Sequence, residues 1–262
     1  MDLTSAGAVS AGTASLAVSG GASFSGTSLT FADAGGVFSV GGQATLTASG
    51  GGSIQISSAG TANFGSIAVS TTGDAVVYED SDTTLAGSSS VDNWTMISSG
   101  VITDNGASVA VAGAFTLQGT SISIGDLASE SLSVAGDLQL TATGGGNISI
   151  GGAAAVNFDA LTFTTTGSVS ITEDSATVLK ASSSAGSLSL TSAGALTDGT
   201  GSAASLTVTG NAAFTAASIS LGDNAGDSIA VSGNAHFTGL SGDVNLSSAG
   251  GMNFGSLTLT GT

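Results

Sequence analysis

The chain repeats itself at a long period, and this repetition limits the possible folds more strongly than any other feature. The segment 63–67 (NFGSI) returns at 157–161 (NFDAL) and at 253–257 (NFGSL), which gives offsets of 94 and 96 residues. Self-similarity at a fixed spacing is typical of solenoids and arrays. We predict one continuous solenoid over 1–262, with large repeats at approximately 1–72 (partial), 73–167 and 168–262.

A shorter period lies inside the long one and measures a single turn. Strands of the form apolar-x-apolar-x-Gly, each followed by a large apolar residue, recur after 22 or 23 residues. The valines at equivalent places in these strands are Val18 and Val40, Val111 and Val134, and Val208 and Val231. One turn therefore takes about 20 to 23 residues, and one large repeat contains about four or five turns.

Strict alternation of apolar and small polar residues predicts that each turn is built from short β-strands. The segments 147–150, 168–172, 187–191 and 256–260 all place apolar residues two apart, on one face of a strand. Gly-rich runs at 49–52 and 144–146 are expected to form corners with positive φ. The expected fold is an all-β, parallel β-helix with a narrow apolar core, and a dozen turns would measure about 60 Å.

The charge of the chain is strongly negative. It has 18 acidic residues against a single Lys and no Arg, which gives a formal net charge of −17. Nucleic acids and anionic membrane surfaces are therefore excluded as partners, because both need Lys and Arg. The chain has no cysteine, so disulfides and thiolate metal sites are excluded as well. It also lacks an apolar run long enough to cross a membrane.

Both ends fall in the middle of the long repeat. We expect an excised segment of a longer protein, with Met1 as a cloning start, because atypical capping turns are missing. Uncapped solenoid ends expose strand edges. A head-to-tail filament of identical subunits is the alternative way to cover them.

The candidates for catalysis are few, and we predict no catalytic residue. A catalytic triad would have to use His236, the only histidine, which alternation places on the outward face of a strand. The pairs Glu79-Asp80 and Glu173-Asp174 could serve glycoside hydrolysis, but adjacent strand residues point to opposite faces. Duplicated acidic corners are the simpler interpretation of these pairs.

Calcium is the one cofactor that the residues suggest, and only as an alternative to none. The segment 223–227 (DNAGD) carries several hard oxygen ligands, its counterpart 126–130 (DLASE) keeps two acids, and 33–36 (DAGG) keeps one. Solvated Asx-rich turns explain the same pattern, so we predict no metal-binding or cofactor-binding residue.

Two further surface functions have weak support in the sequence. An ice-binding face would need Thr-x-Thr pairs on nearly every turn. Such pairs occur at Thr45/Thr47, Thr162/Thr164, Thr207/Thr209 and Thr258/Thr260, but neighbouring turns carry Ser, Ala, Gln or Asp instead, as in 131–135 (SLSVA). A glycan-binding face would need outward aromatic side chains, and Trp94 and Tyr78 are the only amphipathic rings. Both observations favour a structural rod without a specialised binding face.

The whole chain resembles the β-helical shafts of filamentous-haemagglutinin-type and autotransporter-type adhesins, and the giant β-strand-repeat surface proteins of Gram-negative bacteria. The segments 169–174 (VSITED) and 186–194 (GSLSLTSAG) are most similar to their repeats. The resemblance implies a right-handed parallel β-helix, an extracellular or cell-surface location, and a role in adhesion or biofilm. The secretion domain and membrane barrel of those families are absent from the sequence.

We therefore expect a non-enzymatic structural or adhesive rod, a shaft segment of a large bacterial surface adhesin or extracellular fibre. The alternatives are an end-to-end self-assembling filament subunit, or a β-solenoid module that binds calcium or glycan. Expected partners are neighbouring repeats of the same long chain or identical subunits, with a possible cell-surface or glycan receptor.

Overall fold

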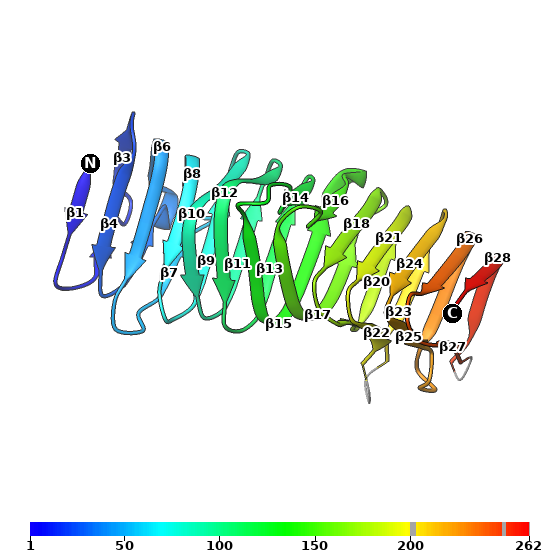
Figure 1. The fold of residues 1–262 in the computed structure, drawn as a ribbon. Helices are drawn as coiled ribbons and strands as arrows, with labels where there is room; N and C mark the ends of the chain where they lie inside the picture. The colour runs from blue at the N-terminus through cyan, green and yellow to red at the C-terminus, as the bar shows by residue number, and fades with distance from the viewer. Residues whose placement is uncertain (200–202, 248–249, 262) are drawn as a thin grey trace.

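The protein is a rod-shaped β-solenoid of about 11 turns. The computed structural model describes residues 1–199, 203–247 and 250–261. Its 28 strands form a single sheet in which all the described ladders are parallel, and the chain runs from one end of the rod to the other (Figure 1). The predicted all-β solenoid is confirmed.

The strands are short, and two three-residue 3-10 helices interrupt them. In the first half they are β1 (Asp2–Thr4), β2 (Val9–Ser10), β3 (Ser15–Val18), β4 (Ala22–Gly26), β5 (Leu29–Phe31), η1 (Asp33–Gly35), β6 (Val37–Ala48), β7 (Ile54–Ile56), β8 (Thr61–Ser70), β9 (Ala75–Glu79), β10 (Thr83–Val91), β11 (Trp94–Ser98), β12 (Ile102–Val111), β13 (Phe115–Gly119) and β14 (Ile122–Ile124). In the second half they are β15 (Ser131–Ala142), η2 (Thr143–Gly145), β16 (Ile148–Ile150), β17 (Ala155–Thr164), β18 (Ser168–Glu173), β19 (Thr177–Leu179), β20 (Ser182–Ala185), β21 (Ser187–Ser192), β22 (Ala195–Asp198), β23 (Ser205–Val208), β24 (Ala212–Ala216), β25 (Ser218–Leu221), β26 (Ser228–Gly239), β27 (Val244–Leu246) and β28 (Met252–Thr260).

The register of the ladders equals the short period of the sequence. The three valine pairs named above are direct neighbours in parallel ladders, as are Phe24 with Leu46 and Phe214 with Phe237. A one-residue slip would turn every apolar side chain outward. The spacing of the apolar residues therefore determines both the turn length and the register.

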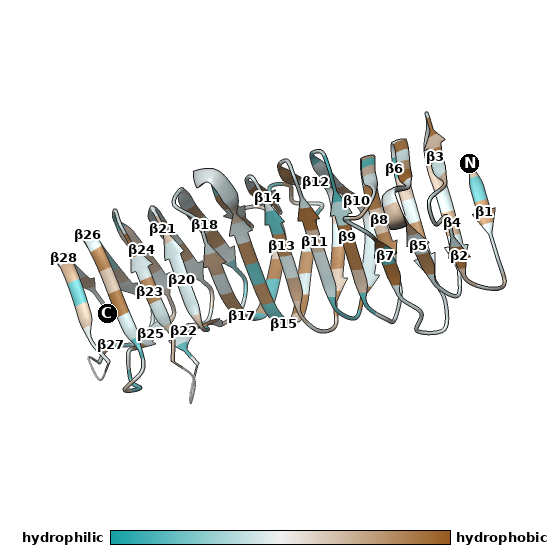
Figure 2. Cartoon of the chain, turned by 180° about the vertical axis from the view of Figure 1, so that it is seen from behind, coloured by the Kyte–Doolittle hydropathy of each residue, from teal (hydrophilic) through white to brown (hydrophobic). Residues whose placement is uncertain are grey.

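The core is a column of apolar side chains that runs along the axis of the rod. Figure 2 shows hydrophobic and hydrophilic bands alternating along the strands. Phe237 stacks on Phe214 with ring centroids 4.5 Å apart, and Trp94 stacks on Phe115 at 4.9 Å. All four rings are buried. Since these stacked pairs join neighbouring turns, burial adds stability turn by turn.

Glycines form the tightest corners, as predicted. Gly50 and Gly51 have φ of 66° and 80°, and Gly144 and Gly145 have φ of 65° and 84°. Residues with a Cβ rarely adopt this left-handed conformation. The equivalent corners of two large repeats therefore use the same backbone solution.

Three parallel ladders run along the first four turns. Ladder I contains β3 and the first halves of β6 and β8; ladder II contains β1, β4 and the second halves of β6 and β8; ladder III begins with β2, β5, β7 and β9. At β10, ladder II divides. Ile67 pairs with Leu85 and Ser70 pairs with Ser90, so four residues of β10 lie opposite two of β8.

The division makes one strand into two. Residues 83–86 pair with 102–105, whereas residues 88–91 pair with 108–111. Gly87, with φ of 69°, makes the new corner between them. The same event recurs 94 residues later, where Leu161 pairs with Leu179 and Thr164 with Ser184. A division of this kind must be matched by the end of another ladder if the turn length is to stay constant.

Candidate functional site

A buried glutamate lies where ladder I ends. Glu79 is 2% exposed and closes β9, where Ala75, Val77 and Glu79 share the inward face. Its Oε1 accepts hydrogen bonds from the backbone N–H of Phe64 at 2.8 Å and from the Ser81 hydroxyl at 3.2 Å. Its Oε2 accepts a hydrogen bond from the Thr83 hydroxyl at 2.7 Å. The carboxylate therefore occupies the place where a further strand would pair with β8.

Asp80 completes this side-chain cap from the other face of the strand. Its Oδ2 accepts a hydrogen bond from the N–H of Ala62 at 2.8 Å, and its own N–H donates to the Ala62 carbonyl at 2.9 Å. Ser89 Oγ accepts the N–H of Val69 at 3.0 Å, at the point where ladder II divides. Together these side chains satisfy the backbone groups that the change of ladder leaves without a strand partner.

The next large repeat, 168–262, supplies a second cap of the same kind. Glu173 Oε1 accepts the N–H of Phe158 at 3.1 Å, and Asp174 Oδ2 accepts the N–H of Val156 at 3.0 Å. Ser183 Oγ accepts the N–H of Phe163 at 3.2 Å. These contacts lie 94 residues after their counterparts. The ladder that ends at this cap is the one that began with residues 88–91. We call each arrangement a Glu-Asp cap.

Burial changes the acidity of the capping glutamates. It raises the pKa of Glu79 to about 7, although the three hydrogen bonds from Thr83, Phe64 and Ser81 act in the opposite direction. Burial likewise raises the pKa of Glu173, against hydrogen bonds from Thr177, Phe158 and Ser175. The removal of the carboxyl groups from water therefore outweighs the donors around them.

The prediction that Glu79 and Asp80 point to opposite faces is confirmed, because Glu79 is buried and Asp80 is exposed. The prediction of a simple acidic corner is wrong for Glu79, which lies inside the solenoid. The missed signal was the inward phase of this glutamate, two residues after Val77. Because the two carboxylates of each pair bind separate backbone groups, they do not face one another across a substrate site.

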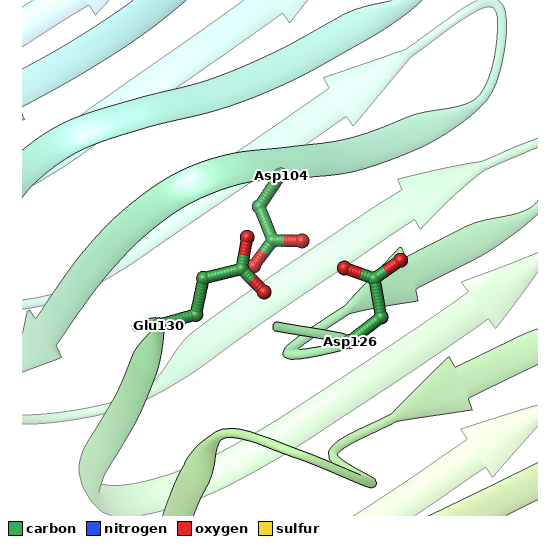
Figure 3. Close-up of side chains that lie close together, drawn as sticks. All are labelled: Asp104, Asp126 and Glu130. Atoms are coloured by element: carbon green, nitrogen blue, oxygen red, sulfur yellow. The ribbon is translucent and has the colours of Figure 1, made fainter. Parts of the chain in front are cut away.

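Three acids form a cluster, here named the first acidic cluster, at a corner between β12 and β15. The carboxylate oxygens of Asp104, Asp126 and Glu130 lie within 4.8 Å of one another (Figure 3). Glu130 is buried and accepts the N–H groups of Gly106 and Leu127, both at 2.8 Å. Its carboxylate thus joins its own loop to the preceding turn.

Asp104 is the acid with the most perturbed environment in this cluster. Its Oδ2 accepts the N–H of Gly125 at 3.0 Å, whereas its Oδ1 is buried and has no hydrogen-bond partner among the described residues. Burial raises the pKa of Asp104 to about 6, and the negative charges of Glu130 and Asp126 add to the increase. The arrangement therefore favours the protonated form of the Asp104 carboxyl group more than water does.

The second acidic cluster consists of Asp198, Asp223 and Asp227, at the equivalent corner of the next large repeat. Asp227 accepts the N–H groups of Ala204 and Asn224, at 2.9 and 2.7 Å. Burial raises the pKa of Asp198, with the charges of Asp227 and Asp223 acting in the same direction. In each cluster a buried carboxylate therefore links its own loop to the preceding turn through two backbone N–H groups.

The first large repeat has no such carboxylate at this corner. The N–H of Gly36 donates to the Asp33 carbonyl, as the N–H of Glu130 donates to that of Leu127. Asp33 therefore occupies the position equivalent to that of Leu127, and Gly36 the position equivalent to that of Glu130. The sequence comparison of 33–36 with 126–130 was one residue out of register.

The other polar candidates lie apart from these corners. His236 is on the outward face of β26, as predicted, with Nε2 3.2 Å from the Thr260 hydroxyl and 3.4 Å from that of Thr238. Lys180 is exposed and forms an ion pair with Asp137 at 2.9 Å, and this hydrogen bond raises the pKa of the lysine. The structure does not bring histidine, acid and nucleophile together in the described residues.

The two amphipathic rings do not form an outward face. Trp94 is 1% exposed and belongs to the core, whereas Tyr78 lies on the outward side of β9. The Thr-x-Thr pairs also remain isolated, because Thr45 pairs with Ser23 and Ala68. A single outward column of threonines does run through five adjacent strands: Thr172, Thr191, Thr215, Thr238 and Thr260. The residues two positions before them are Ser, Ser, Ala, His and Thr, so the described ladders do not form a flat face of paired threonines.

None of the helices in the described residues is long and apolar enough to span a membrane. Residues 166–232 match the model of a family described as repeats of unknown function (DUF5649). This similarity covers β18 to β25 and the start of β26, including the Glu173-Asp174 cap and the second acidic cluster. No curated protein and no solved structure matches the chain.

Proposed function

We propose that this chain is a non-enzymatic structural rod, a shaft segment of a large bacterial surface adhesin or extracellular fibre. The observation that carries the proposal is the continuous stacking of about 11 turns through parallel ladders and one apolar column. Such a column holds its two ends at a fixed separation, about 50 Å at the usual spacing between strands.

The acidic residues support a structural role rather than catalysis. The buried carboxylates of Glu79, Glu130, Glu173 and Asp227 accept backbone N–H groups. Groups engaged in this way stabilise corners and ladder ends. The excess of negative charge favours solubility and repulsion between neighbouring rods.

The location is tested by labelling intact cells of the organism that encodes the chain. Antibodies raised against the folded rod, visualised with gold in the electron microscope, should label the outside of the cell without permeabilisation. An antibody against a cytosolic protein is the control. Label that appears only after permeabilisation would refute an extracellular shaft.

The shaft role is tested by deleting residues 80–173 in frame. This deletion joins Glu79 to Asp174 and so keeps one Glu-Asp pair, because Asp174 is the equivalent of Asp80 at the 94-residue period. It removes about four turns. A shaft should remain folded and support partial attachment of cells to surfaces. Complete loss of attachment by a folded, surface-exposed deletion variant would instead place a binding site within residues 80–173.

Calcium binding at the two acidic clusters is an alternative function. The clusters bring three acids together at equivalent corners, but the buried acid of each already accepts two N–H groups. Isothermal titration with calcium at pH 7.5 decides the matter. Saturable binding that the Asp126→Asn, Asp223→Asn double variant loses would favour the alternative, and no heat of binding would favour the shaft.

A further inference from the structure

The last strand of the structure is the third copy of a segment that is covered in its first two copies. Residues 253–256 (NFGS) repeat 63–66 exactly in sequence and resemble 157–160. The first copy lies in β8 and the second in β17, and a turn that carries a Glu-Asp cap covers each of them. Within the described residues, β28 pairs with β26 alone.

The apolar side chains of the third copy are exposed, unlike those of the first two copies. Leu257 and Leu259 are 45% and 53% exposed, whereas their counterparts Ile67 and Val69 are fully buried. In the second copy Leu161 and Phe163 are also fully buried. The surface at the end of β28 therefore has the apolar content of a covered turn.

The backbone of β28 presents the same donors that the caps bind elsewhere. Met252 and Phe254 occupy the places of Ala62 and Phe64, whose N–H groups bind Asp80 and Glu79. The N–H of Ile229 donates to the Gly251 carbonyl. Because successive strand residues point their N–H and C=O groups to opposite sides, those of Met252 and Phe254 face away from β26.

A second copy of this chain does not supply the matching acids. Residues 1–21, which form its first turn, contain Asp2 as their only acid and lack a Glu-Asp-Ser sequence. The Glu-Asp-Ser segments at 79–81 and 173–175 lie within the rod, with both glutamates buried. Head-to-tail stacking would leave the N–H groups of Met252 and Phe254 opposite a turn without a cap.

We propose that the open edge of β28 is a docking site for a further turn of this repeat, one that carries a Glu-Asp-Ser cap. Its glutamate and aspartate accept the N–H groups of Phe254 and Met252, and its apolar face covers Leu257 and Leu259. This assignment follows from the fold and does not depend on where the rod is used.

The test extends the full chain by one turn. Residues 261 and 262 correspond to 71 and 72, so a copy of residues 73–93 is attached after Thr262. A matched extension carries Ala-Ala in place of the copied Glu-Asp pair, and the chain without an extension is the reference. Amide hydrogen exchange at Met252 and Phe254 is the readout, because it reports whether these N–H groups are bonded.

The Glu-Asp extension should slow exchange at Met252 and Phe254 by about tenfold or more, the effect of one charge-assisted hydrogen bond. The Ala-Ala extension should give much less protection. Equal exchange with the two extensions would overturn the proposal. So would protection of Met252 and Phe254 in the unextended chain together with end-to-end oligomers in sedimentation, because a second copy would then be the occupant.

Discussion

Replacement of Glu79 by glutamine tests the most unusual feature of the core, a titrating carboxyl group inside a β-solenoid. Burial raises the pKa of Glu79 from 4.5 to about 7. A group with a raised folded-state pKa binds its proton more tightly in the folded protein. The stabilisation of the folded protein by this bound proton is therefore fully present below pH 4.5 and is lost as the pH rises through about 7.

The magnitude follows from the size of the shift. The pKa is raised by about 2.5 units, and each unit corresponds to about 1.4 kcal/mol. The free energy of unfolding should therefore fall by about 3 kcal/mol between pH 4.5 and pH 8. Glutamine keeps a carbonyl oxygen for the N–H of Phe64 and does not titrate. Over this pH range, the fall in the free energy of unfolding should therefore be about 3 kcal/mol smaller for the Glu79→Gln variant than for the wild type.

The assay is urea unfolding, followed by far-ultraviolet circular dichroism at pH 4.5, 6 and 8. Asp92→Asn is the matched control, because Asp92 is exposed and its side chain accepts no hydrogen bond among the described residues. A wild type whose stability rises with pH, together with a Glu79→Gln variant that is weakest at pH 8, would refute the reasoning. That result would mean that the three donors around Glu79 outweigh its burial.

Four other substitutions test three separate parts of the structure. Phe237→Ala removes a fully buried ring stacked on Phe214. It should lower the free energy of unfolding by about 3 to 5 kcal/mol in urea titrations. A loss below about 1 kcal/mol would contradict a packed column. Gly87→Ala should lower the free energy of unfolding by about 1 kcal/mol, because φ there is 69°. Ala181→Gly should not destabilise the protein, since Ala181 has φ of 55° at the equivalent corner. Equal effects of the two substitutions on the thermal midpoint would argue against left-handed corners. Ser89→Ala leaves the buried N–H of Val69 without its acceptor and should cost about 1 to 3 kcal/mol, with faster amide exchange at Val69 as the specific readout.

The turn length, the register and the corners could be predicted from the sequence because they depend on local patterns. The valine spacings of 22 and 23 residues are the observed ladder pairings. The Gly-rich runs at 49–52 and 144–146 form corners with positive φ. Alternation also placed His236 on the outward face correctly, since it needs only the phase of one strand.

The Glu-Asp caps could not be predicted in the same way, because their role depends on strands that are distant in the sequence. Glu79 binds Phe64 in the preceding turn, and the need for this bond arises only because ladder I ends at the first half of β8. The inward phase of Glu79 was visible, but the end of a ladder was not. The burial of Trp94 was also hidden, because alternation alone does not identify the ring of Phe115 on which it stacks.

The most direct test of the central claim, that the chain is one rod with a constant rise per turn, measures distances along a single outward column. One residue from each of eight successive strands lies in this column, in the order Ser66, Thr84, Thr103, Ser123, Ser149, Ser170, Ser189 and Ala213. The absence of native cysteine allows spin labels at Ser66 and at Ser123, Ser170 or Ala213 in turn.

Electron–electron distances should increase in equal steps, by about 4.8 Å per strand, which gives about 14, 24 and 34 Å for the three pairs before the label arms are added. Distances that fail to rise with the number of intervening strands would contradict a single stacked rod, and the proposed shaft function with it.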